Sequence, residues 1–283
     1  MLDPENTFRI ALVQPLSHKP GQDEKNIPDA IEYIRKAAAG GAHFVCFPEN
    51  YPGPWRIEAF YDPIPTIAAA AKEHKIHVIF GTLELIDEKK ETAYNLTCMA
   101  YPDGKVVKKR RTHPRGPYVY TGGKAWEFQY VAGDDFPVFD TEHGKVGLAM
   151  CSEIYIPEVA RAFVLRGAEL LFFPAGVDKQ PQWYTWRTLI WARAIENLAL
   201  VVTTQNMFNH QERGLAMIAS PEQILFESTA VGLSVIEVSL DPIRELRAGE
   251  DKQPTPGASA VKRGLLGDVW QRPELYKHIY SKK

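Results

Sequence analysis

The sequence predicts an α/β fold. Strand and helix patterns alternate over the first half of the chain, and hairpins follow in the middle and at the end. With 283 residues, 45% of them hydrophobic, the chain can bury a core that fits one large α/β domain or two small ones. No linker divides it, so we expect a single domain over residues 1–283. A polar segment with two prolines, residues 251–259, leads into an expected extended tail from about residue 250 to 283.

In the first half, apolar runs rich in β-forming residues alternate with helical patterns. Residues 8–14 predict a strand. A helix follows, whose apolar residues recur at helical spacing from Ile27 to Ala38, and Gly40 ends it. The next expected elements are a strand at residues 43–47, a helix at 65–74 and a strand at 76–85.

Hairpins are expected in the middle of the chain. Residues 94–101 and 105–112 flank a turn at Gly104, and residues 136–140 and 145–151 flank a turn at Gly144. A helix opens near Pro157, because proline suits the first position of a helix. The remaining expected elements are a strand at 168–174, a helix at 182–197, a strand at 198–205 and a closing meander of strands at 214–220, 224–228 and 232–240.

The charge balance and the termini exclude several classes of partner. There are 33 Lys and Arg against 35 Asp and Glu, so the net charge of -2 gives no general attraction to nucleic acid or anionic membranes. The N-terminus lacks the basic start and long apolar stretch of a signal peptide, and no apolar run approaches the roughly 18 residues that span a bilayer. We expect neither a nucleic-acid nor a membrane partner.

The chain has three cysteines, Cys46, Cys98 and Cys151, without CxxC spacing. An odd, sparse set predicts neither a disulfide framework nor a cysteine zinc site, and it indicates a cytoplasmic location. Cys46 and Cys98 lie inside apolar strands, which predicts core packing for both. Cys151 ends a predicted strand, a few residues before a helix begins. This is a suitable mount for a nucleophile, although a free cysteine can equally be a small buried hydrophobe.

Two further positions carry charge next to predicted strands. Glu49 directly follows a buried strand, where it either faces a ligand at the sheet edge or caps a loop. Residues 105–111 include five basic residues, which could form a nucleic-acid patch. Because strand side chains alternate, Lys109 and Arg111 share one face; that face could carry a cation into a site while the other is solvated.

Taken together, several segments resemble the nitrilase, or carbon–nitrogen hydrolase, superfamily. The likeness covers about residues 8 to 242 and follows the family's order. The matching segments are FVCFPEN at 44–50, DGKVV at 103–107 leading to RRTHP at 110–114, GKVG at 144–147, CSEIYIPE at 151–158, ARAIEN at 192–197 and DPI at 241–243. The resemblance implies a four-layer α-β-β-α sandwich and a homodimer or larger homo-oligomer, with neither a metal nor an organic cofactor.

The resemblance also implies roles for individual residues. Cys151 matches the nucleophile and Glu49 the catalytic glutamate. Arg111 occupies the position of the family's catalytic lysine; arginine keeps the charge, but its pKa above about 12 prevents it from releasing a proton. Lys109 fills that role if the register is shifted. Glu127 matches a further glutamate that orients the cation or the attacking water, or is a surface carboxylate.

These roles predict a hydrolase that cleaves a non-peptide carbon–nitrogen bond in an amide, an N-carbamoyl compound or a nitrile. Glu49 takes the proton of Cys151, a thioester forms, and water clears it. The alternative is a catalytically altered relative that acts as a binding or structural protein because Arg111 replaces the lysine. The loop at 113–123 and the aromatics Trp183, Tyr184 and Trp186 either shape the pocket or serve the core or an interface.

Overall fold

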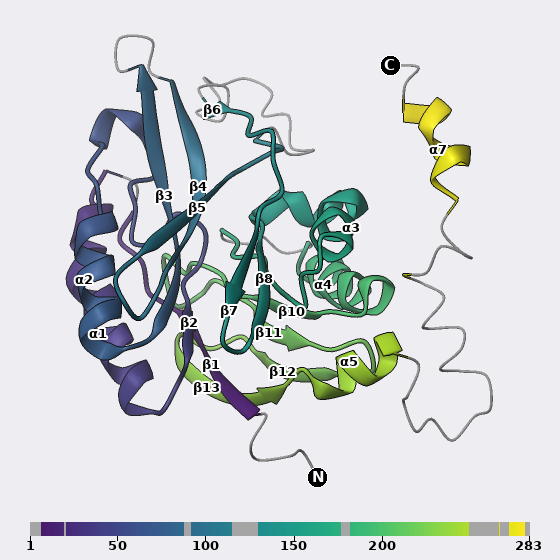
Figure 1. Cartoon of the computed structure of the whole chain (residues 1–283). Coiled ribbons are helices and arrows are strands. Elements are labelled where there is room, and N and C mark those ends of the chain that lie inside the picture. Colours follow the sequence, from purple (N-terminus) through teal and green to yellow (C-terminus); the bar gives the residue numbers. More distant parts are fainter. Residues whose placement is uncertain are drawn as a thin grey trace.

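The computed structural model of the chain contains two β-sheets that face each other, with a pair of helices outside each sheet (Figure 1). The structure describes residues 7–19, 21–87, 92–114, 130–176, 182–248, 266 and 272–280. This arrangement confirms the expected α-β-β-α sandwich. No helix within these ranges is both long and apolar enough to cross a membrane.

The first sheet has a parallel centre with antiparallel strands on both sides. β1, β2 and β3 run parallel, whereas β13, β4 and β5 are antiparallel to their neighbours. In sheet order the strands are β13 (Gly232–Ser239), β1 (Thr7–Gln14), β2 (Phe44–Cys46), β3 (His77–Asp87), β4 (Thr92–Ala100) and β5 (Val106–Arg110), and β6 (Tyr130–Val131) also pairs with β4. Helices α1 (Asn26–Ala39) and α2 (Ile64–His74) cover its outer face (Figure 1).

The second sheet repeats this design. β8, β9 and β10 run parallel, and antiparallel strands flank them. The strands in order are β12 (Ile224–Ser228), β11 (Ala216–Ala219), β10 (Leu200–Thr203), β9 (Leu170–Phe172), β8 (Gly144–Leu148) and β7 (Val138–Thr141). Helices α3 (Pro157–Leu165) and α4 (Trp183–Asn197) cover its outer face. Within the described ranges, short 3-10 helices lie at Asp23–Lys25, Ile57–Ala59 and Cys151–Tyr155.

Alternation along the strands places apolar side chains on both faces of each sheet, so that one core lies between the sheets and another lies under each helical layer. On β1, Ile10 and Leu12 pack between the two sheets, while Ala11 and Val13 pack toward α1 and α2. The opposite facing of successive residues explains this division. Cys46 lies in the core between the sheets and Cys98 in the core under α1 and α2, both fully buried, so the packing role expected for them is confirmed.

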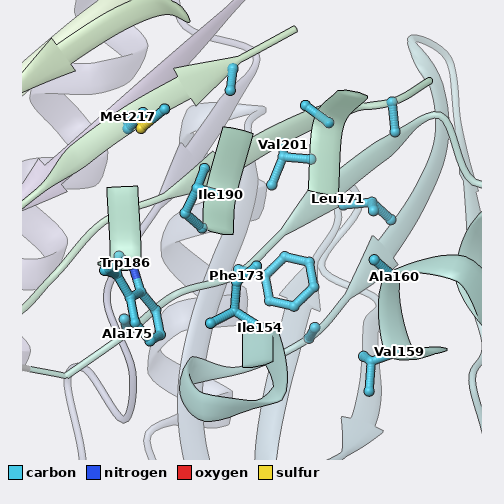
Figure 2. Close-up of a cluster of buried hydrophobic side chains, with 14 of the residues drawn as sticks. Ile154, Val159, Ala160, Leu171, Phe173, Ala175, Trp186, Ile190, Val201 and Met217 are labelled. Carbon is cyan, nitrogen blue, oxygen red and sulfur yellow. The ribbon is translucent and has the colours of Figure 1, made fainter. Parts of the chain in front are cut away.

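The third core lies between the second sheet and helices α3 and α4 (Figure 2). It contains Ile154, from the 3-10 helix that begins at Cys151, together with Phe173 and Ala175 from the segment after β9. All three side chains are at most 1% exposed. The turn that carries Cys151 is therefore fixed to the helical layer by close packing.

The expected closing meander is wrong in its last strand. β11 and β12 pair as predicted, but β13 joins the other sheet and runs antiparallel to β1 from Thr7↔Ser239 to Gln14↔Gly232. A strand pattern specifies which side chains face inward, not which edge the strand joins. Helices α5 (Asp241–Ala248) and α7 (Pro273–Tyr280) were not predicted, and α7 lies within the segment expected to be an extended tail.

Candidate active site

Three charged or nucleophilic residues converge where strands of both sheets end. Glu49 follows β2, Arg111 follows β5 and Cys151 follows β8. An ion pair joins Arg111 Nη1 to Glu49 Oε1 at 3.2 Å, and both side chains are about 95% buried (4% and 5% exposed). The Glu49 carboxylate also lies close enough to the Cys151 thiol for its negative charge to raise the pKa of that thiol. The first and second sheets therefore each contribute to one cluster, in which Glu49 and Arg111 are buried and Cys151 is half-buried.

The backbone of Glu49 is held by the second sheet. Its N–H donates to Ala175 O at 3.1 Å, and its carbonyl accepts a hydrogen bond from Asn206 Nδ2 at 2.7 Å. Asn206 in turn accepts a hydrogen bond from Ser17 Oγ at 2.6 Å. These contacts fix the residue after the strand, so its carboxylate has a defined place beside Arg111.

Two glycines make room for this carboxylate and its turn. A Cβ on Gly81 of β3 would lie 2.3 Å from the backbone nitrogen of Asn50, which itself has a positive φ of 46°. A Cβ on Gly176 would lie 2.9 Å from Glu49 Oε2. The absence of a side chain lets the backbone of Asn50 approach Gly81, and the carboxylate of Glu49 approach Gly176, this closely.

Cys151 occupies a sharp turn between β8 and α3. Its φ of 45° is in the left-handed region, and its N–H donates to Pro174 O at 2.8 Å. Burial raises the pKa of the Cys151 thiol well above its usual range, and the negative charge of Glu49 raises it further. The charge of Arg111 and a hydrogen bond from the backbone of Gly176 oppose this rise. At rest the residue is a thiol that has a carboxylate beside it to accept the proton.

Arg111 is anchored on three sides. Nε donates to the carbonyl of His113 at 3.1 Å, Nη1 to Glu49, and Nη2 to the hydroxyl of Ser152, the residue after Cys151. Its own backbone N–H donates to Asn95 O at 2.8 Å, which continues the pairing of β5 with β4. The guanidinium thus bridges the glutamate and the nucleophile turn, as its forked geometry allows.

Lys109 lies on the same strand face but has a different partner. Its Nζ is 2.7 Å from both oxygens of Glu153, and both side chains are fully buried. On the opposite face, Lys108 and Arg110 are exposed and paired with Glu84. The predicted alternation of the basic strand is therefore observed, and of the two buried cations Arg111 is the one in contact with Glu49.

The other sequence-derived candidates are placed as follows. Glu127 and residues 115–123 of the expected pocket loop lie outside the described residues. Trp183 and Trp186 are buried in the core under α3 and α4, whereas Tyr184 is 68% exposed, which favours core and surface roles over a pocket role. Within the described ranges, no group of three or more His, Cys, Asp and Glu could hold a metal ion.

Sequence reasoning missed the contacts made by Ser152, Glu153 and Gly176. Ser152 and Glu153 contact side chains on the segment around Arg111, and Gly176 lies against Glu49; no local pattern reveals such distant partners. Gly81 had a signal, since an isolated glycine in a strand often marks a close backbone approach.

A thiol, a carboxylate and a guanidinium in one buried cluster can perform covalent hydrolysis. The carboxylate can take the proton of the thiol, the sulfur can attack an electrophilic carbon, and the cation can stabilise the negative charge that develops on the attacked group. The other two cysteines, Cys46 and Cys98, are buried in apolar cores.

Comparison with known proteins agrees with this geometry. The family model described as carbon-nitrogen hydrolase matches residues 9–248. The omega-amidase NIT2 of Mus musculus is 32% identical over 212 residues, which cover 70% of this chain and 74% of that protein. The deaminated glutathione amidase of Synechocystis sp. (strain PCC 6803 / GT-S) is 27% identical over 257 residues, which cover 84% of this chain and 94% of that protein.

Solved structures share the fold. An amidase from Nesterenkonia sp. AN1, in a form with a covalent adduct on its active-site cysteine, superposes with a TM-score of 0.77 and 19% identity, over 98% of both chains. Nit3 of Saccharomyces cerevisiae superposes with a TM-score of 0.73 and 21% identity, over 89% of this chain and 97% of that one. At such identities the likeness establishes the four-layer fold.

Proposed function

Because the chain belongs to the carbon–nitrogen hydrolase family, we propose that it hydrolyses a small carboxamide through a thioester on Cys151. The enzyme is a carbon–nitrogen hydrolase with a cysteine nucleophile. The alternative of a catalytically altered binding or structural relative has no support from the mouse and Synechocystis relatives described above, both of which are named amidases. The observation that carries the proposal is the buried contact of Arg111 with both Glu49 and Ser152, beside the nucleophile.

Glu49 carries the proton through both half-reactions. It takes the proton of the Cys151 thiol as the sulfur attacks the amide carbon, and it then gives that proton to the departing amine or ammonia. The carbon–nitrogen bond breaks and the thioester remains. Water next loses a proton to Glu49 and attacks the thioester, which releases the carboxylic acid and restores the thiol. The raised pKa of Cys151, due to burial and the charge of Glu49, supports proton transfer at the moment of attack.

Arg111 provides the positive charge that the lysine provides in the family, but it takes no part in proton transfer. Its pKa is too high for it to act as an acid or a base, so Glu49 makes every proton transfer. Together with the N–H of Ser152, the guanidinium stabilises the oxyanion of each tetrahedral intermediate. The proposed role of Glu127 is to orient this cation or the attacking water.

The names of the two relatives described above favour an amide over a nitrile or an N-carbamoyl compound. The mouse protein is an omega-amidase, and the Synechocystis protein acts on deaminated glutathione as an amidase. The test is ammonia release from a panel of short carboxamides, nitriles and N-carbamoyl compounds. We expect turnover of at least one carboxamide, and a loss of at least about 10³-fold in Cys151→Ala.

Cys98→Ala is the matched control, because Cys98 is fully buried in the core under α1 and α2. It should retain the turnover of the wild type. Wild-type turnover in Cys151→Ala, or no turnover of any compound by the wild type, would overturn the proposed function.

The assembly proposed for the enzyme is a homodimer that pairs through α3 and α4. The support is a set of large apolar side chains on the outer surface of these helices: Leu165, Tyr184 and Ile195 are 57%, 68% and 43% exposed. Light scattering coupled to size-exclusion chromatography should give twice the chain mass, and Leu165→Glu should shift it toward the monomer. A cytoplasmic location is proposed as well, because the three cysteines are free thiols.

A further inference from the structure

We propose that Glu153, through its buried ion pair with Lys109, is a positioning residue that holds Arg111 at the distance from Cys151 that hydrolysis requires. The inference rests on the proposed function, since it assigns a role to residues that act through Arg111. Neither Glu153 nor Lys109 contacts the substrate in this account. Their effect on the rate passes entirely through the guanidinium.

The Glu153 carboxylate ties together the two segments that carry Arg111 and Cys151. Oε1 accepts hydrogen bonds from the N–H of Thr112 at 2.8 Å and from its hydroxyl at 2.6 Å. Oε2 accepts the N–H of Met150 at 2.9 Å, and Lys109 Nζ lies 2.7 Å from both oxygens. The carboxylate therefore holds the residues that flank Arg111 on one side and a residue that flanks Cys151 on the other.

Burial and the attraction between the two charges act in opposite directions on the pKa of each member of the pair. Burial alone would raise the pKa of Glu153, but the charge of Lys109 and hydrogen bonds to the carboxylate hold it well below its usual range. Burial lowers the pKa of Lys109, and the charge of Glu153 opposes this fall. A fully buried ion pair is seldom a net gain in stability over apolar side chains of similar volume. We therefore attribute the place of this ion pair between the two catalytic segments to the positions that it fixes and not to stability.

In every hydrogen bond described above, an oxygen of Glu153 is the acceptor. The substitution Glu153→Gln therefore disturbs these contacts without changing the size of the side chain. The amide retains the volume, but its NH₂ group cannot accept a hydrogen bond, so either Thr112 or Met150 faces a donor. Lys109 also loses its counter-charge. A shift of about 1 Å in a group near the reacting atoms can cost about 10²-fold. We expect kcat to fall roughly 10- to 100-fold, with KM within about threefold of the wild type.

A double-mutant cycle separates positioning from general damage to the fold. If Glu153 acts through Arg111, Glu153→Gln should lower kcat by less than about twofold in an Arg111→Gln background. Glu169→Gln is the control, since it breaks an ion pair with Arg244 (2.7 Å) outside the catalytic cluster; any effect it has should be the same in both backgrounds. Unchanged kcat in Glu153→Gln, or an equal loss in both backgrounds, would overturn the inference.

Two additions keep the test decisive. If Glu153→Gln does not fold, Thr112→Val removes the hydroxyl contact with Glu153, together with that to His113 Nδ1 at 3.0 Å, and keeps the carboxylate. We expect a roughly threefold loss of kcat that disappears in the Arg111→Gln background. The rate of Cys151 alkylation by iodoacetamide provides a readout without turnover, because the charge of Arg111 favours the thiolate. Glu153→Gln should slow alkylation at least about threefold with Arg111 present and not in Arg111→Gln.

The alkylation cycle also distinguishes failure of the inference from failure of the proposed function. Wild-type protein without amide turnover, but with the expected alkylation cycle, would overturn the proposed function and leave the positioning role supported. Normal turnover with equal alkylation losses in both backgrounds would overturn the positioning role alone.

Discussion

Replacing Arg111 by Gln removes the only cation in contact with Glu49 among the described residues. The guanidinium donates from Nε to His113 O (3.1 Å), from Nη1 to Glu49 (3.2 Å) and from Nη2 to Ser152. A glutamine carries one uncharged NH₂ group and cannot bridge Glu49 and Ser152. Loss of a single oxyanion donor costs about 10²- to 10³-fold in kcat, or about 2.7–4 kcal/mol. We expect a loss in this range for Arg111→Gln.

Arg111→Lys tests whether charge or shape is the more important property. Lysine restores the residue found at this position in the family's motif, but its single nitrogen cannot hold Glu49 and Ser152 as a fork does. We expect kcat to be roughly tenfold below the wild type, between the wild type and Arg111→Gln. The assay is initial-rate ammonia release over a range of carboxamide concentrations.

Arg110→Gln is the control for these variants. Arg110 is the neighbouring residue of the same type, but its side chain is 47% exposed and paired with Glu84 at 2.9 Å on the opposite strand face. An exposed pair of this kind contributes little, so kcat should stay within about twofold. The reasoning is refuted if Arg111→Gln retains kcat within about threefold of the wild type, or if Arg110→Gln loses as much.

Three further predictions concern other residues of the fold and the site. Glu49→Gln should lower kcat about 10²- to 10⁴-fold because no base remains for the thiol, and an unchanged kcat would exclude Glu49 as the base. Gly81→Ala should lower the thermal midpoint by several degrees, since its Cβ would lie 2.3 Å from the nitrogen of Asn50; an unchanged midpoint in calorimetry would contradict the close approach. Burial lowers the pKa of His77, opposed by Glu142, so the folded state binds this proton less readily than the unfolded state. The free energy of unfolding in urea should therefore fall as pH drops below about 6.5, by at most about 1.4 kcal/mol per pH unit, and His77→Gln should reduce that slope; an unaltered slope would contradict this account.

The four-layer fold was predictable because local patterns and short motifs both point to it. The apolar run at residues 8–14 predicted the strand β1, and the structure packs both faces of this strand into apolar cores. The partner of β13 was not predictable, because facing is a local property and pairing is not. Its neighbour β1 lies more than 200 positions away, and only the folded chain brings their edges together.

The candidate site was predictable to the level of residue type and strand face. The alternation of β5 put Lys109 and Arg111 on one face, but it could not decide between them, because residues two apart share their direction. The decision comes from contacts 44 and 62 positions away, with Glu153 and Glu49. No pattern within residues 105–111 indicates which distant residue each of the two cations contacts. The role of Arg111 in catalysis stays a prediction until its variants are measured.

The central claim is that Cys151 forms a covalent acyl intermediate, and intact-mass measurement of the enzyme during turnover tests it most directly. Acid quenching of the reaction with a turned-over carboxamide should reveal the mass of the acyl group, located on the peptide that contains Cys151 and removed by hydroxylamine. Cys151→Ala should carry no adduct, and Cys98→Ala should carry the same one as the wild type. Turnover without any adduct, or an adduct that persists in Cys151→Ala, would contradict the account.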